Sequence, residues 1–594
     1  MNISRPAIFI AFLSFVLVIT SAQSPAQAAT AAHKKHASPS KQPRTSVGEL
    51  ADEVRALREQ MEQQRQQLLA EQQRQQQQID LLQQQLQQAQ IANAQAQQAK
   101  TQAEAAQQQT ASVQQSLATV QQDVASQQKT VAATTTEVRE IHKAIDSPAW
   151  WRYKGMTITP GGFIEAASVW RQHGMSADID TPFNAIPYPG AAAYNTSDFF
   201  GSARQSRLTL LAEGKIKNAT FRGYYETDWL SAGTTSNNNQ SNSYTNRQRQ
   251  LFAQVAFNDG WQLTGGQMWS LVTETKKGLD NRTEALPMTI DPQYHVGFSW
   301  ARQYGFRAVK DFGDKFWIGA AIENPQATVA THGNAANFFL GGPGNGAGLY
   351  NPTANYSFNP SPDIIVKAAA EPGIGHYELF GILSRFRDRI YPDATAATPS
   401  VAGAHNDSRS GGGIGANARI SFAKRFDLGT HFLGGRGVGR YGTSSIADST
   451  VRPDGTLAML TSYQALGTFE VHTKMWDWYF NAGAEYAGRD SYLNAAGKPV
   501  GYGSPLFSNV GCTTETLPGP GGFAPGAVAN CNADTRDVIE GTFGFWFKPY
   551  SGEKGRIQFG PQYSYIVRNS WNGIGGAPGT SQNMLMTSFR YYIP

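Results

Sequence analysis

The feature that most constrains this chain is a series of short segments after residue 150 in which apolar and polar side chains alternate. In Thr220 to Trp229, Phe221 and Tyr225 fall on one face of an extended strand, whereas Arg222 and Glu226 fall on the other. One face suits lipid and the other suits water. Each segment is near the roughly 9 to 11 residues that a tilted strand needs to cross a bilayer.

The gaps between these sixteen segments run long and short in turn along the chain. The short gaps, such as Lys217-Asn218, have turn chemistry, and the long gaps are rich in Gly, Asn, Ser, Thr and Pro. The long gaps are 172–200, 231–246, 273–295, 325–360, 389–409, 442–456, 489–535 and 569–582. Eight long and seven short gaps leave both ends of the series on the short-turn side. This pattern predicts an all-β, sixteen-stranded antiparallel transmembrane barrel over 148–594.

A soluble propeller or solenoid could share the alternation, but it would not need the asymmetry of the gaps. Helical membrane proteins are excluded because, past the N-terminus, no run of about 20 apolar residues occurs. Aromatic residues make up 11% of the chain, which is enough for the interfacial girdles of a barrel.

The N-terminal part predicts export followed by a helical stalk. Arg5, the apolar stretch Ala7 to Ile19 and the small residues before Ala28 indicate a signal peptide over 1–28. Residues 29–46 are small, polar and basic, which predicts a disordered leader. Residues 47–147 are Gln-rich, with apolar residues at spacings of three and four, which predicts a long N-terminal coiled-coil helix. A disordered Gln-rich spacer is the alternative.

The two cysteines of the chain, Cys512 and Cys531, lie in the same long gap. In an exported protein this favours a structural disulfide. Two thiols without a neighbouring histidine supply too few ligands for a metal, so we expect neither a metal site nor a cofactor.

Five short motifs in order resemble DcaP-like trimeric outer-membrane porins, and the resemblance covers about 150–594. They are Gly266–Ser270, Trp300–Gln303, Glu323–Pro325, Pro362–Ile365 and Gly435–Tyr441. The resemblance implies a sixteen-stranded homotrimer whose third external loop folds inward to narrow the pore. It also implies a preference for small anions such as dicarboxylates.

Arginine is in excess among the residues expected to line the lumen, and a charge on the lipid face at midplane would cost about 2–4 kcal/mol. The candidates for pore lining and anion binding are Arg207, Arg222, Arg247, Arg249, Arg302, Arg307, Arg385, Arg387, Arg419, Arg436 and Arg440. The candidates in the third long gap, which would constrict the pore, are Glu274, Lys276, Lys277, Asp280, Arg282, Glu284 and Asp291. The alternative for the whole set is wall salt bridges with Glu165, Glu213, Glu226 and Asp228.

The sequence therefore favours a porin of the outer membrane, with its stalk in the periplasm, that passes small hydrophilic and preferentially anionic solutes. No Ser/His/Asp arrangement has recognisable context, so we do not expect an enzyme. The net charge of +5 is too small over 594 residues to specify a partner, and we expect no nucleic acid. A rival hypothesis is an envelope tether, in which a plugged barrel anchors a stalk that reaches the peptidoglycan.

Overall fold

The computed structural model describes residues 119–138, 151–231, 245–334, 336–343, 355–518, 522 and 527–594. The expected signal peptide, the basic leader and most of the expected stalk lie outside the described residues. The chain divides into two compact units, Met1–Ile145 and Asp146–Pro594.

Residues 119–138 of the first unit form a helix. Its less exposed positions are Val120, Val124, Val131, Thr134 and Val138, at spacings of four, seven, three and four residues, which fit the expected heptads. In the described part of the chain, no helix combines the length and apolarity needed to cross a bilayer.

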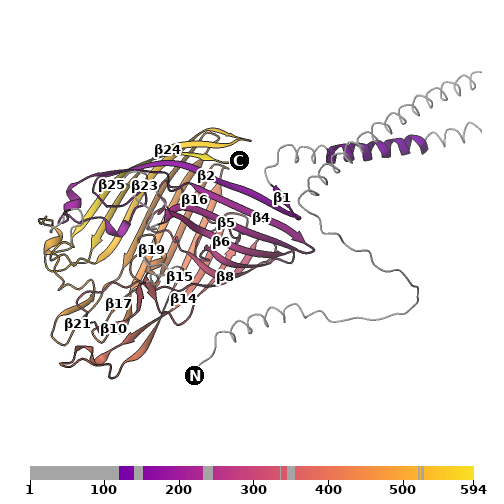
Figure 1. Cartoon of the computed structure of the whole chain (residues 1–594). Coiled ribbons are helices and arrows are strands. Elements are labelled where there is room, and N and C mark those ends of the chain that lie inside the picture. Colours follow the sequence, from indigo (N-terminus) through magenta and orange to yellow (C-terminus); the bar gives the residue numbers. More distant parts are fainter. Residues whose placement is uncertain are drawn as a thin grey trace, which may run out of the picture. The chain divides into compact units, whose positions relative to one another are not determined.

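The second unit is a closed antiparallel β-barrel of sixteen strands (Figure 1), which confirms the predicted strand number. Each strand pairs with its neighbour in sequence, and the first and last strands close the cylinder through pairs from Phe163 with Tyr592 to Arg171 with Met584. The barrel strands are β2 (Met156–Arg171), β4 (Arg207–Ile216), β5 (Ala219–Ser231), β6 (Thr245–Phe257), β7 (Trp261–Trp269), β8 (Arg302–Asp311), β9 (Phe316–Glu323), β13 (Asp363–Ala370), β14 (His376–Ile390), β15 (His405–Phe422), β16 (Phe426–Arg436), β19 (Thr461–His472), β20 (Trp476–Ala487), β23 (Thr535–Gly552), β24 (Gly555–Ser570) and β25 (Gly579–Tyr592).

Shorter elements extend the barrel wall or lie within the loops. β1 (Trp151–Tyr153), β3 (Asp198–Ser202) and β10 (Phe338–Phe339) add to the wall beside β2 and β14. The loop elements are η1 (Phe183–Ala185), η2 (Ala192–Asn195), β11 (Gly341–Pro343), β12 (Asn355–Ser357), η3 (Pro392–Thr395), η4 (Gly439–Tyr441), β17 (Ser449–Val451), β18 (Leu457–Met459), β21 (Asp490–Leu493), β22 (Pro499–Tyr502) and η5 (Val510–Cys512).

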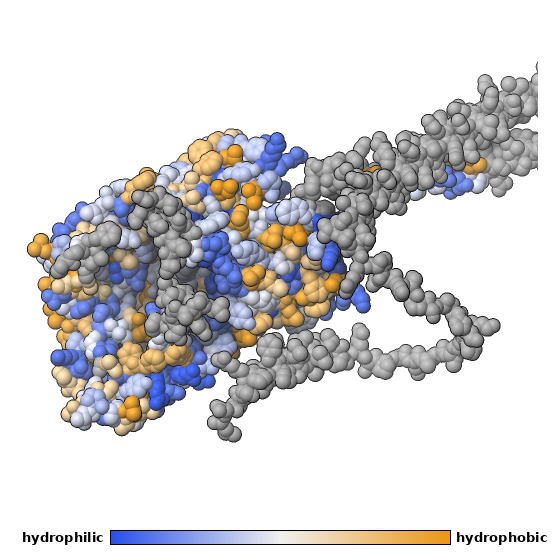
Figure 2. Space-filling view, in the orientation of Figure 1, coloured by the Kyte–Doolittle hydropathy of each residue, from blue (hydrophilic) through white to orange (hydrophobic). Residues whose placement is uncertain are grey.

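The alternation along each strand separates an exposed outer face from a buried inner face. On β14, for example, Leu379 and Leu383 are exposed while Phe380 and Phe386 are buried. Figure 2 shows apolar side chains gathered over the outer wall of the barrel. A belt of this kind is the surface that an outer-membrane barrel presents to lipid.

Short turns join the strands at one end of the barrel, and long loops join them at the other. The two-residue turn Lys217-Asn218 links β4 to β5, and Lys217 adopts a φ of 53°, as such hairpin turns require. We name the long loops L1 to L8 in chain order. They are L1 (172–197), L2 (232–244), L3 (270–301), L4 (324–362), L5 (391–404), L6 (437–460), L7 (488–534) and L8 (571–578). In L7, Cys512 and Cys531 form a disulfide.

Candidate functional site: the barrel lumen

Loop L3 folds into the barrel and binds strands around much of its wall. Thr275 donates a hydrogen bond to Glu378 of β14, and the backbone nitrogen of Val296 donates to Glu540 of β23 at 2.9 Å. The backbone nitrogen of Ile290 donates to Gln562 of β24 at 2.6 Å. Because these strands lie on different sides of the barrel, L3 crosses the interior.

Loop L1 packs on L3 inside the external half of the barrel. Ile179 and Phe183 of L1 lie in one buried cluster with Ile290 of L3 and with Val538 and Ile566 of the wall. This part of the interior is apolar, which differs from the uniformly polar lumen that strand alternation predicts. The reason is that the inner face meets inserted loops here instead of water.

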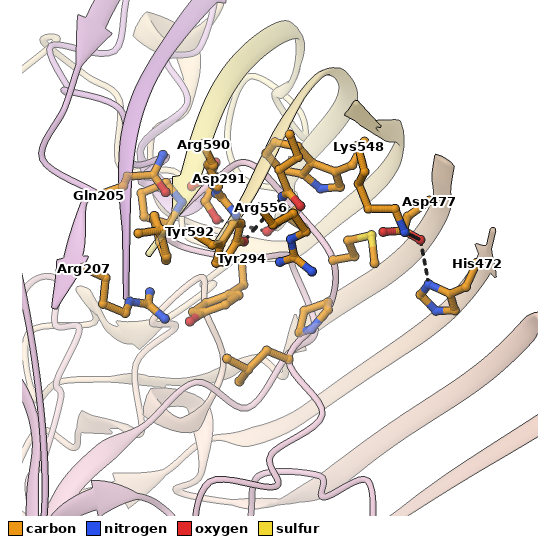
Figure 3. A pocket seen from close by; sticks show the side chains of 18 residues that line it. Gln205, Arg207, Asp291, Tyr294, His472, Asp477, Lys548, Arg556, Arg590 and Tyr592 are labelled. Atoms are coloured by element: carbon orange, nitrogen blue, oxygen red, sulfur yellow. Dashed lines mark hydrogen bonds and ion pairs between the residues drawn. The ribbon is translucent and has the colours of Figure 1, made fainter. Parts of the chain in front are cut away.

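Below L3, toward the short-turn end, lies a cavity of about 520 Å³. Its roof is formed by residues 286–294 of L3, and its walls come from β2, β19, β20, β23, β24 and β25, with Gln205 and Arg207 beside them. In the view of Figure 3, Arg207 and Tyr294 lie on one side of the cavity and Lys548, Asp477 and His472 on the other, with Arg556 between them.

Basic side chains outnumber acidic ones around this cavity. The basic residues are Arg207, His472, Lys548, Arg556 and Arg590, and the acidic residues are Asp291 and Asp477. Lys548 binds Asp477 at 2.7 Å, and Arg590 binds Glu165 at 2.9 Å.

Arg556 differs from its neighbours in the cavity. Its guanidinium lies 4.0 Å from the centre of the Tyr592 ring, and its Nε has no hydrogen-bond partner. Within the described residues, no carboxylate comes within 4.0 Å of it. Its charge is therefore available to a solute.

Most of the arginines expected to line the pore point inward but bind carboxylates of the wall or loops. Arg249 is 1% exposed and binds Glu226 at 2.6 Å and Asp228 at 2.7 Å. The other pairs are Arg207 with Glu226 (3.4 Å), Arg222 with Glu213 (2.8 Å), Arg247 with Asp228 (2.8 Å), Arg419 with Glu274 (2.8 Å) and Arg440 with Asp363. The pairs with Glu213, Glu226 and Asp228 are those of the salt-bridge alternative.

Two further arginine candidates, the half-buried Arg302 and the buried Arg307, lie beside Trp269 at the start of L3. Arg302 stacks on the Trp269 ring at 4.6 Å, and Arg307 donates a hydrogen bond to the Trp269 carbonyl at 2.6 Å. Neither forms an ion pair within 4.0 Å in the described residues. Their contacts brace the loop.

Three arginine candidates do not line the lumen, and that expectation was wrong. Arg385 and Arg387 share the outer face of β14 with Leu379 and Leu383. Arg436 likewise shares the outer face of β16 with Leu428 and Phe432. Strict alternation sends the odd-numbered residues of β14 and the even-numbered residues of β16 outward.

The L3 candidates are divided between the wall and the solvent. Glu274 is held by Arg419, Asp280 accepts a hydrogen bond from Gln262 at 2.5 Å, and Asp291 is 2% exposed in the cavity roof. Lys276 and Lys277 are exposed. Arg282 stacks on the Tyr224 ring at 4.9 Å. The backbone of Glu284 pairs with that of Thr275 in an isolated β-bridge. Glu274 and Asp280 are therefore bound to residues of the wall.

Sequence reasoning missed Lys548, Arg556 and Arg590, which line the cavity. All three lie at even-numbered positions on strands whose even-numbered residues, such as Gln558 and Ser588, are buried inside. Alternation applied residue by residue would have found them.

One cluster on the rim of the cavity has the residue types of a metal site. Ligand atoms of Asp427, Glu470 and His472 lie within 4.8 Å of one another. Both ring nitrogens of His472 also lie within 3.3 Å of carboxylate oxygens, including Asp477. A protonated ring satisfies these carboxylates without an ion.

Comparisons with known proteins agree with this architecture. No protein-family profile matches the chain, and no curated protein sequence is significantly similar. The outer membrane channel DcaP of Acinetobacter baumannii has a similar structure, with a TM-score of 0.52 and 13% identity over 75% of this chain and 99% of that one.

An anion-selective porin from Comamonas acidovorans and OprB of Pseudomonas putida match with TM-scores of 0.40 and 0.39, at 10% and 11% identity. They cover 74% and 76% of this chain, and 100% and 96% of their own. The likeness to the DcaP channel shows the fold of this chain. The described barrel therefore has an outer-membrane porin fold similar to that of DcaP.

Proposed function

We propose that this protein is a homotrimeric porin of the outer membrane that passes small hydrophilic solutes and favours anions such as dicarboxylates. The observation that carries the proposal is the basic cavity beneath L3, in which Arg556 has no acidic partner. The closed sixteen-stranded wall and its apolar outer belt support the membrane location.

The size of the electrostatic effect explains why one unpaired arginine matters more than many paired ones. At about 4 Å and an effective dielectric near 20, one charge attracts an anion by roughly 4 kcal/mol, and screening removes most of this beyond about 8 Å. A paired arginine such as Arg249 contributes little, because its carboxylate partners repel the same anion. Arginine also suits carboxylates because its planar fork offers several fixed donors.

Loop L3 supports the transport proposal by narrowing the lumen. Its hydrogen bonds to β14, β23 and β24 hold the loop against the wall in the absence of any solute. Solutes would pass between this fixed loop and the wall that carries Arg556.

The test is ion current through the purified full-length protein in a planar lipid bilayer. We expect stepwise conductance, and in a salt gradient we expect a reversal potential that shows anion preference. Folding would be verified by the resistance of the barrel to unfolding in cold detergent. Folded protein that carries no current would contradict the porin proposal and favour the envelope tether. Current with ideal cation preference would contradict the anion preference alone.

A further inference from the structure

Four arginines form a patch on the outer wall near the long-loop end of the barrel. Arg385, Arg387 and Arg389 follow one another at every second residue on β14, and Arg436 lies on β16. The strand between them, β15, carries small residues at this level, because Ser410 pairs with Arg385 and Gly412 with Arg436. We call these four residues the outer arginine patch.

The patch lies above the apolar belt of the barrel. Along the outer face of β14 the order is Tyr377, Leu379, Gly381 and Leu383, and then the arginines begin. A strand tilted by about 40° advances roughly 2.5 Å per residue along the membrane normal. Arg387 therefore lies roughly 25 Å above Tyr377, which equals the height of the apolar band of such barrels. By this estimate Arg387 and Arg389 reach the level of the lipid headgroups, and Arg385 lies just below them.

The guanidinium groups of the patch have no acidic partners. Arg387 donates to the Phe358 carbonyl at 3.2 Å, Arg389 to the Asn406 side chain at 3.2 Å, and Arg436 to the Met459 carbonyl. No carboxylate among the described residues lies within 4.0 Å of the four arginines. The undescribed parts of L2, L4 and L7 contain no charged residue in their sequence. The barrel unit leaves several permanent charges on this surface uncompensated.

Aromatic rings flank the arginines. Phe339 of β10 pairs with Arg389 across the strands, and its ring lies 5.5 Å from that of Phe358. Arg389 itself stacks against Tyr391 at 5.6 Å. Aromatic and basic side chains together suit a ligand with an anionic head and apolar chains.

A second copy of this chain is a poor partner for the patch. The carboxylates of the barrel strands face inward, as Glu323, Glu378 and Glu540 illustrate. Near the external end of β23, Asp537 is already bound by Arg536 at 2.6 Å. The wall of another protomer therefore offers few free acids at this level.

We propose that the outer arginine patch binds the phosphate groups of a phosphorylated glycolipid in the outer leaflet of the membrane. Arg385, Arg387 and Arg389 stand about 6.7 Å apart in succession, so neighbouring guanidinium groups can each hold one phosphate by paired hydrogen bonds. The proposal rests on the membrane location of the barrel and not on conduction.

The test compares lipid retention by full-length wild-type protein and by the triple variant R385Q/R387Q/R389Q. Folded protein in detergent would be incubated with bisphosphorylated lipid A or with its dephosphorylated form, and bound lipid would be measured by native mass spectrometry. The matched control is K424Q/R425Q/K474Q, which removes the same charge from exposed short turns at the other end. Bilayer conductance would be recorded for all three proteins.

We expect wild type and control to retain phosphorylated lipid A, and the patch variant to lose at least about tenfold in affinity, with unchanged conductance. Wild type should bind the dephosphorylated lipid weakly, and inorganic phosphate at equal concentration should not displace lipid A. Equal retention by wild type and patch variant, or equal binding of both lipids, would overturn the proposal. A patch variant that dissociates into monomers and still retains lipid A would assign the patch to subunit contact instead.

Discussion

The charge that we expect to set selectivity belongs to Arg556. Replacing it with Gln should lower the anion preference measured as a reversal potential, because each of the other basic residues of the cavity lies beside a carboxylate. Arg385→Gln is the matched control, because it removes the same charge from the outer wall. An Arg556→Gln channel with the selectivity of wild type would contradict this role.

We expect the paired Arg249 to stabilise the folded barrel. It is buried between Glu226 and Asp228, so Arg249→Met would leave two inward carboxylates short of a partner. We expect a loss of about 3–5 kcal/mol in the free energy of unfolding. Arg222→Met removes a half-exposed pair and should cost about 0–1 kcal/mol.

The measurement is guanidinium unfolding of both variants in phospholipid vesicles, followed by tryptophan fluorescence. Equal losses for the two variants would show that the burial of the Arg249 cluster has no energetic consequence.

At this scale the sequence identifies residue types better than their positions. Wall salt bridges with the inward acids Glu165, Glu213, Glu226 and Asp228 were the alternative to pore lining, and the structure pairs each of these acids with an arginine. Arg385, Arg387 and Arg436 were wrongly expected to face the lumen, because the inward–outward alternation was not followed to the ends of β14 and β16. A β-bulge beside Arg249 also changes which residues of β6 face inward, and a bulge has no clear signal in the sequence.

Among the elements, loops L4 and L7 are joined by a hydrogen bond between a histidine and an aspartate. His332 of L4 lies 2.8 Å from Asp534 of L7, and this hydrogen bond raises the pKa of His332 above its ordinary 6.5. Because the folded pKa is raised, the contact stabilises the loops fully below about pH 6.5 and weakens as pH rises through the raised pKa.

We therefore expect faster amide exchange, corrected for intrinsic rates, at His332 and Gly501 above the raised pKa than at about pH 6. The backbones of these two residues pair with each other beside the contact. Hydrogen exchange with mass spectrometry measures this, and His332→Gln should abolish the pH effect. A pH effect that persists in His332→Gln would assign it to another group.

The sequence predicted which elements exist but not where the long loops go. Strands and turns follow from local alternation and turn residues, both of which can be read within a dozen positions. The inward path of L3 was expected only by resemblance, because its contacts join distant residues, such as Thr275 with Glu378. The packing of L1 on L3 had no local signal at all.

For the whole molecule, we expect the barrel and not the stalk to determine the number of subunits. The expected stalk is rich in Gln at its predicted seam positions, which predicts a weak zipper on its own, whereas a trimeric barrel would hold three stalks at high effective concentration. A variant lacking residues 29–146 should therefore remain a trimer by native mass spectrometry. A monomeric variant beside a trimeric full-length protein would show that the stalk drives assembly.

The seam between β2 and β25 has a consequence for biogenesis. The wall is complete only when β25, the last barrel strand in the sequence, pairs with β2, the first. Until then the polypeptide has two unpaired edges, which readily associate with other chains. We therefore expect the unclosed barrel to be the form most prone to aggregation, and loss of the fourteen-residue β25 would leave an open, aggregation-prone sheet.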